Sequence, residues 1–146
     1  MSHVKTQIID AVVALLTGLS ITGTSVFKIR KYNLEELSLP SICIYSGDEE
    51  IKYISMDKPR LQKRDFVFHV EIYGKNSTDI DAYLNTISKE VEEKVLSYEN
   101  LSGLVKDLFL ESIELDSDAQ ESTFGILKLK YKTMYLVREN NISLAL

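Results

Sequence analysis

The sequence predicts an α/β protein of the α+β type, with a mostly antiparallel central sheet on which an N-terminal helix and a second long helix pack. Three observations support this fold class. Residues 66–72 alternate between apolar and polar side chains, as a half-buried strand does. Residues 80–95 repeat apolar side chains at helical spacing. Residues 124–137 alternate again and provide a second long strand.

The first predicted element is a helix from about Ser2 to Thr17, ended by Gly18. Its apolar face comprises Val4, Ile8, Ala11, Val12, Leu15 and Leu19. Asp10 interrupts the apolar run, which is far shorter than the roughly 20 residues that cross a bilayer. No small-residue cleavage pattern of a signal peptide follows it. We therefore expect this helix to pack on the sheet and not in a membrane.

Two shorter strands and a charged segment come next. Residues 26–30 alternate weakly, and residues 41–45 form an apolar run between Pro40 and Gly47, so both predict strands. Cys43 lies in the second strand as a small buried hydrophobe, which fits a reducing cytoplasm. The turn at 47–50 should close that strand. Residues 51–64 mix charges with isolated apolar side chains, so we expect an exposed excursion that orders only against a partner.

The second half of the chain predicts a strand, a helix and a closing hairpin. Phe66, Phe68, Val70 and Ile72 share the core face of the strand at 65–74. A helix then runs from Thr78 to Leu96. Apolar residues change parity within 101–115, which a bulge or a helical turn before a strand would explain.

The closing strand spans residues 124–137 and follows a polar loop at 116–122. Its core face comprises Leu127, Leu129, Tyr131 and Tyr135. Residues 139–146 should form a loose tail. We expect residues 1–146 to form a single domain, because 146 residues with 45% hydrophobic and 27% charged side chains are ordinary for one.

Catalytic, cofactor and metal motifs fail on inspection. Residues 18–25 copy P-loop spacing, but Thr24 replaces the phosphate-binding lysine and a helix precedes the segment, so we interpret it as a helix exit. Asp116, Asp118 and Glu121 lack the remaining ligands of a calcium loop and predict a solvated acidic tip. A structural zinc has too few ligands, namely His3, His69 and Cys43. We predict no catalytic residue, metal or cofactor.

Three lysines at alternate positions form a row on one strand face: Lys128, Lys130 and Lys132. The plainer interpretation is a solvated face whose lysines discourage edge-to-edge aggregation. The row could instead meet phosphates or the acidic surface of a neighbouring subunit. The formal net charge of −5 and the absence of an aromatic platform favour the solvated face. Of the two functional interpretations, we favour the contact with a neighbouring subunit.

The order of elements resembles the tail terminator family of long-tailed bacteriophages, which includes the lambda-type minor tail protein. The resemblance spans nearly the whole chain. It rests on the order of the two helices, the charged excursion and three stretches: Leu39-Pro40-Ser41-Ile42, Arg64-Asp65-Phe66-Val67-Phe68 and Gly125-Ile126-Leu127. It implies a small non-enzymatic virion protein, assembled in the host cytoplasm. Such a protein forms a hexameric ring on the finished tail tube, stops tube growth and presents the surface that joins the head.

This resemblance supplies partners but no residue-level motif. It implies that the chain binds itself, the tail-tube protein and a head-completion or neck protein, while DNA passes through the lumen without specific binding. From their expected exposure we predict ring or tube contacts at Tyr53, Met56, Arg60, Asp116 and Asp118, with the three lysines as further candidates. Three alternatives stay open: another neck or tail-completion protein, a small-ligand-binding regulatory domain, and an enzyme.

Overall fold

The computed structural model describes residues 2–28, 39–76, 78–97, 101–117 and 124–146. Its elements along the chain are α1 (Val4–Leu16), β1 (Val26–Phe27), β2 (Ser41–Tyr53), β3 (Leu61–Lys75), α2 (Ile80–Leu96), the 3-10 turn η2 (Leu101–Gly103), β4 (Asp107–Ser117) and β5 (Phe124–Arg138). The strands form a 5-stranded sheet in the order β1-β2-β3-β5-β4. Every neighbouring pair is antiparallel except β1 and β2, so the predicted α+β fold is confirmed.

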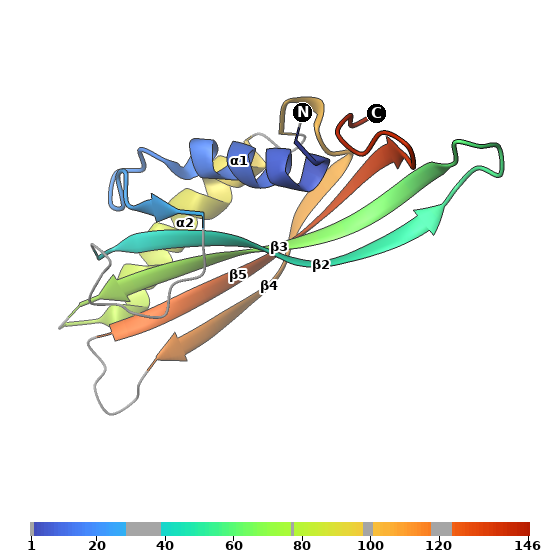
Figure 1. The fold of residues 1–146 in the computed structure, drawn as a ribbon. Helices are drawn as coiled ribbons and strands as arrows, with labels where there is room; N and C mark the ends of the chain where they lie inside the picture. The colour runs from blue at the N-terminus through green and yellow to red at the C-terminus, as the bar shows by residue number, and fades with distance from the viewer. Residues whose placement is uncertain (1, 29–38, 77, 98–100, 118–123) are drawn as a thin grey trace.

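Both helices pack on one face of the sheet, which we call the inner face (Figure 1). The four core residues predicted for β3, Phe66, Phe68, Val70 and Ile72, are fully buried there. The predicted inner residues of β5 are buried as well, and the Tyr131 ring stacks on Phe68 with centroids 5.2 Å apart. The alternation in these two strands therefore predicted the centre of the core correctly.

The helices match their predicted periods with small shifts. In α1 the fully or nearly fully buried residues are Val4, Ile8, Ile9, Val12 and Leu16, while the predicted Ala11, Leu15 and Leu19 are only partly buried. The helix begins two residues after the predicted start at Ser2, because the His3 ring caps it by accepting from the Lys5 amide. α2 begins at Ile80, two residues after the predicted start at Thr78, and Asp79 is its N-cap. No helix in the described residues is long and apolar enough to span a membrane.

The prediction that residues 47–50 end a short strand is wrong. β2 continues to Tyr53 and pairs with β3, which begins at Leu61, so most of the predicted excursion is a β-hairpin. Between Ser46 and Glu49 the strand advances by three residues while β3 advances by two, from Phe68 to Phe66. This bulge inserts one extra residue and reverses which side chains face inward. Glu49 therefore lies on the inner face, although Tyr45 lies on the outer one.

Gly47 makes the bulge possible. A Cβ atom at this position would lie 2.9 Å from the His69 ring and 3.1 Å from the Val67 carbonyl oxygen. Any side chain would push the two strands apart, so the bulge needs glycine here.

A second bulge explains the parity change predicted within residues 101–115. Leu110 pairs with Tyr131, and Ser112 pairs with Lys130, so Glu111 is the extra residue. The helical turn that we considered as an alternative is also present, as η2. Beyond the bulge, Ile113 and Leu115 lie on the inner side of β4. The closing hairpin of β4 and β5 is confirmed, and its tip at 118–123 lies outside the described residues.

The segment after β5 folds back, in contrast to the loose tail that the sequence predicts. The Leu146 amide donates to the Leu136 carbonyl at 2.9 Å, and the Val4 amide donates to the Ile142 carbonyl at 3.0 Å. The Gln7 side-chain amide donates to the Ser143 carbonyl at 2.8 Å. These bonds hold the chain end against the start of α1.

Candidate assembly surfaces

The hairpin of β2 and β3 beyond the first bulge projects past the helices (Figure 1). We call residues 49–64 the hairpin arm. At its far end Met56 is 86% exposed, Tyr53 is 55% exposed and Ile54 is also exposed. The Arg60 guanidinium carbon lies 5.7 Å from the centre of the Tyr53 ring, within cation–π range. The arm thus presents large apolar side chains beside a cation, a composition enriched at protein interfaces.

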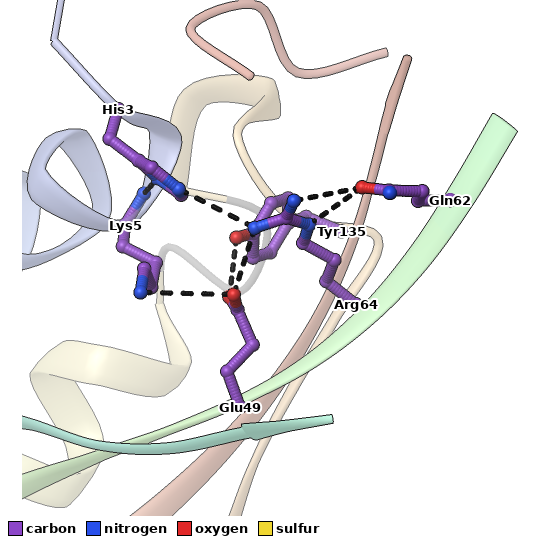
Figure 2. Close-up of polar contacts among 6 residues, drawn as sticks. All are labelled: His3, Lys5, Glu49, Gln62, Arg64 and Tyr135. Atoms are coloured by element: carbon purple, nitrogen blue, oxygen red, sulfur yellow. Dashed lines mark hydrogen bonds and ion pairs between the residues drawn. The ribbon is translucent and has the colours of Figure 1, made fainter. Parts of the chain in front are cut away.

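A polar cluster fixes the arm to the body where the arm begins (Figure 2). We call it the root cluster; its members are His3, Lys5, Glu49, Gln62, Arg64 and Tyr135. Glu49 is its centre: one carboxylate oxygen accepts from the Arg64 guanidinium at 2.9 Å, and the other accepts from the Tyr135 hydroxyl at 2.5 Å. The Lys5 ammonium lies 3.8 Å from the same carboxylate. One carboxylate therefore links β2, β3, β5 and α1.

The guanidinium of Arg64 is satisfied from two sides. The Gln62 carbonyl oxygen accepts from its Nε and Nη2 at 3.0 and 2.8 Å, and Glu49 accepts from Nη1. Arg64 and Gln62 are buried, and a buried cation is tolerated only with this degree of pairing. Burial, and next the hydrogen bond to Glu49, raise the pKa of Tyr135, so this tyrosine stays a donor at neutral pH.

His3 takes part in the cluster as a neutral ring. Its Nδ1 accepts from the Lys5 amide at 3.0 Å, which places the neutral ring's proton on Nε2. The 3.4 Å approach of Arg64 to Nε2 is then a contact between two N–H groups and not a strong hydrogen bond. Burial, followed by the charge of Lys5, lowers the pKa of His3, and Arg64 adds to this against the opposing effect of Glu49.

A second exposed apolar surface lies on β4, a strand at the edge of the sheet. Ile113 and Leu115 are each 46% exposed on its inner side, and Phe109 is exposed on its outer side. The strand contains four acidic residues, Asp107, Glu111, Glu114 and Asp116, and no basic one. We call these seven residues the β4 edge surface. An edge strand with exposed apolar side chains is a site where another chain can add.

The lysine row lies on the outer face of the sheet, where all three side chains are half-buried. Because β5 lies between β3 and β4, the lysines do not guard an edge, and that interpretation is wrong. The Lys128 ammonium is 4.0 Å from Glu71, and the Lys130 ammonium is 3.7 Å from Glu111. Two members of the row thus have acidic neighbours within the subunit.

Glu71 is the buried centre of this outer face. It is 1% exposed and accepts from the hydroxyls of Tyr45 at 2.7 Å and Tyr73 at 2.5 Å. Burial, and next the bond to Glu71, raise the pKa of Tyr73. His69 stacks on Tyr45 with ring centroids 5.0 Å apart and is half-buried, not a free surface residue. In the described ranges, His, Cys, Asp and Glu form no group of three suited to a metal.

The structure separates the predicted contact residues into distinct regions. Tyr53, Met56 and Arg60 lie together on the hairpin arm, while Asp116 is exposed near the end of β4. Asp118 lies outside the described residues. The sequence argument missed the root cluster and the exposed Ile113 and Leu115. A parity change read as a bulge would have placed this pair on the same face as Leu108 and Leu110, but it could not have shown that β4 is an edge strand.

Comparison with known proteins gives the chain a family. The family model of phage minor tail protein U matches residues 3–135. Among solved structures, one match is a chain from the virion of a native gene transfer agent particle, with 12% identity, 90% of each chain covered and a TM-score of 0.39. No curated protein matches. Because the family model covers most of the sequence, the chain belongs to the phage minor tail protein U family and has a structural role in the phage tail.

Proposed function

We propose that this protein is the tail terminator: a ring, hexameric in our proposal, that caps the tail tube, stops its polymerisation and provides the surface for head joining. The observation that carries the proposal is the hairpin arm, with exposed Tyr53 and Met56 at its tip and the root cluster holding its base. In a phage tail protein, an ordered apolar arm of this kind is suited to binding another subunit or the tube.

Capping has a simple physical requirement. A tube subunit adds because the growing end repeats one complementary surface, and a ring with a different outer face removes that template. A closed ring of identical subunits needs two different surfaces on each subunit that match each other. The arm and the β4 edge surface differ from each other and would supply these two surfaces.

The proposed partners follow from this geometry. One face of the ring would bind the last ring of the tail-tube protein, and the other a head-completion or neck protein. DNA would pass through the lumen, where the formal net charge of −5 opposes tight phosphate binding. The protein would act as a structural part of the virion and not as a catalyst.

Assembly is tested by mass. Six chains of 16.6 kDa give 6 × 16.6, or about 100 kDa, for the closed ring. Native mass spectrometry at raised protein concentration should detect this species, or a monomer that forms rings only on added tail tubes. A twofold dimer that persists under all conditions would contradict the proposal.

Function is tested by complementation. A phage that lacks this protein should make tails longer than normal that fail to join heads, as seen by electron microscopy. The double variant Tyr53→Ser/Met56→Ser should unfold cooperatively but fail to rescue this phage, since both side chains are exposed. Asp48→Ser/Glu50→Ser, exposed on the other face of the same strand, is the matched control and should rescue. Head-joined tails of normal length in the absence of the protein would rule out a terminator.

A further inference from the structure

We infer that the hairpin arm of one subunit packs on the β4 edge surface of the next, so that this single contact, repeated, closes the ring. The inference rests on the proposed ring and names the two halves of its interface. The partner at the β4 edge surface is a second copy of this chain. Position, charge and apolar composition of the two surfaces support it.

The Ile113 and Leu115 part of the β4 edge surface lies too far from the tip of the arm for the two to meet within one subunit. Strand pairing gives each surface a position along β5. Tyr53 pairs with Gln62, and Gln62 pairs with Val137 of β5. Ile113 pairs with Leu129 of β5. Val137 lies eight positions along β5 from Leu129, which corresponds to roughly 26 Å of strand. The arm and the Ser117 end of β4 accordingly lie at opposite ends of the sheet (Figure 1). A contact between them must join two subunits head to tail, which is the heterologous arrangement that forms rings.

The charges of the two surfaces are opposite. Residues 51–60 of the arm contain Lys52, Lys58 and Arg60 against the single acid Asp57. The β4 edge surface contains four acids and no basic residue, although Lys130 lies near one of them, Glu111. Two copies of the arm would repel one another, as would two copies of the β4 edge. Charge therefore favours arm against edge and disfavours both twofold alternatives.

The apolar parts are also matched in kind. The arm offers Tyr53, Ile54 and Met56, and the edge offers Ile113, Leu115 and Phe109, all of them exposed. The arm and β4 also each have a strand edge without a partner strand. Within the described residues β1 pairs with β2 only at Ile42 and Cys43, and β4 has a partner only in β5. Exposed apolar side chains beside an unpaired strand edge are expected to be covered in the assembled particle.

Crosslinking tests this contact. The double variant Met56→Cys/Ile113→Cys, treated with a short bis-maleimide in the assembled state, should give a ladder of covalent species that ends at six chains. A mixture of the two single variants should give covalent dimers only, and each single variant alone should stay monomeric. The native Cys43 is buried, so the parent protein is the background control. Met56→Cys/Ala14→Cys, with the second cysteine exposed on α1, is the positional control and should give no ladder.

The possible failures are distinguishable. Hexamers in native mass spectrometry without crosslinks in the double variant would overturn the arm-to-edge contact and leave the ring intact. Covalent dimers from Met56→Cys alone would overturn it in favour of a twofold arm contact. Absence of any assembly, with or without tail tubes, would overturn both the contact and the proposed function. As a second measure, Ile113→Ser/Leu115→Ser should fold but lose the hexamer.

Discussion

The same two strands, β2 and β3, build both the body of the sheet and the hairpin arm, and their inner side chains have different surroundings in each. In the body, Phe66 and Phe68 lie under the helices and are fully buried. In the arm, Ile51 and Tyr53 lie on the same inner face but are exposed, because the arm extends past the helices. The two strands therefore stay paired beyond the point where the helices stop covering the inner face.

This difference shows how stability and assembly are separated along one hairpin. The body contributes apolar burial, and the root cluster marks the boundary with charged and hydrogen-bonded groups. Beyond it, the arm keeps backbone pairing and exposes the side chains available to a partner. Substitutions should accordingly change stability in the body, both properties at the root, and assembly in the arm.

The largest effect on stability is expected in the body. Phe68→Ala should lower the free energy of unfolding by roughly 3–5 kcal/mol, because it leaves a cavity beside the stacked Tyr131 ring. Lys130→Ala, on the outer face of the neighbouring strand, should cost under about 0.5 kcal/mol as a comparison. Denaturant titration measures both, and the reverse ranking would show that the inner and outer faces are inverted.

A smaller but clear effect is expected at the root. Glu49→Ala removes the acceptor for Arg64 and Tyr135 and leaves the buried guanidinium with Gln62 alone. The cost should be about 3 kcal/mol. Glu50→Ala, an exposed carboxylate at the next position, is the matched control and should change stability by less than about 0.5 kcal/mol. Equal losses in the two variants would mean that the root cluster does not hold the arm.

The smallest effect is a pH dependence at His3. Its pKa is lowered in the folded protein from the ordinary 6.5, so the unfolded chain takes up this proton first as the pH falls. The contribution of the neutral ring to the free energy of unfolding is fully present above pH 6.5. It is lost as the pH falls through the lowered pKa of the folded protein. His3→Asn keeps an N-cap acceptor without a titrating ring. Unfolding titrations from pH 7.5 to 5 should show a stability loss in the parent that exceeds the loss in this variant, whereas a relative gain would mean that Glu49 stabilises the charged ring.

The regular parts of the fold were predictable from sequence, and the reasons are visible at particular residues. Phe66 to Ile72 alternate without interruption, and the stripe from Ile80 to Val95 keeps a helical period, so local pattern and burial agree. The arm was not recognised as strands, because its inner residues Ile51 and Tyr53 have no core to face and its outer residues are charged. Burial patterns cannot reveal a strand such as the β2 part of the arm, where residues 50–53 are exposed on both faces.

The candidate site was predictable only in part. The residues Tyr53, Met56 and Arg60 were chosen for exposure, and their placement together depends on the hairpin that the sequence argument did not predict. The root cluster joins Lys5, Glu49 and Tyr135 from distant parts of the chain. Such groups come together only in the folded sheet. Neither the spacing of residues nor the composition of the sequence predicts these long-range contacts.

The bulge at Gly47 has a consequence for how the arm can change in length. Since the bulge sets which side chains of the arm face inward, deleting one residue there would turn Glu49 outward and leave the buried Arg64 with Gln62 as its remaining acceptor. An insertion of one residue in a strand of the arm would likewise invert the faces of the residues that follow it. The arm can lengthen without inverting its faces only in steps of two residues per strand, each adding roughly 6.6 Å of reach. Relatives of this protein should therefore have arms of discrete lengths.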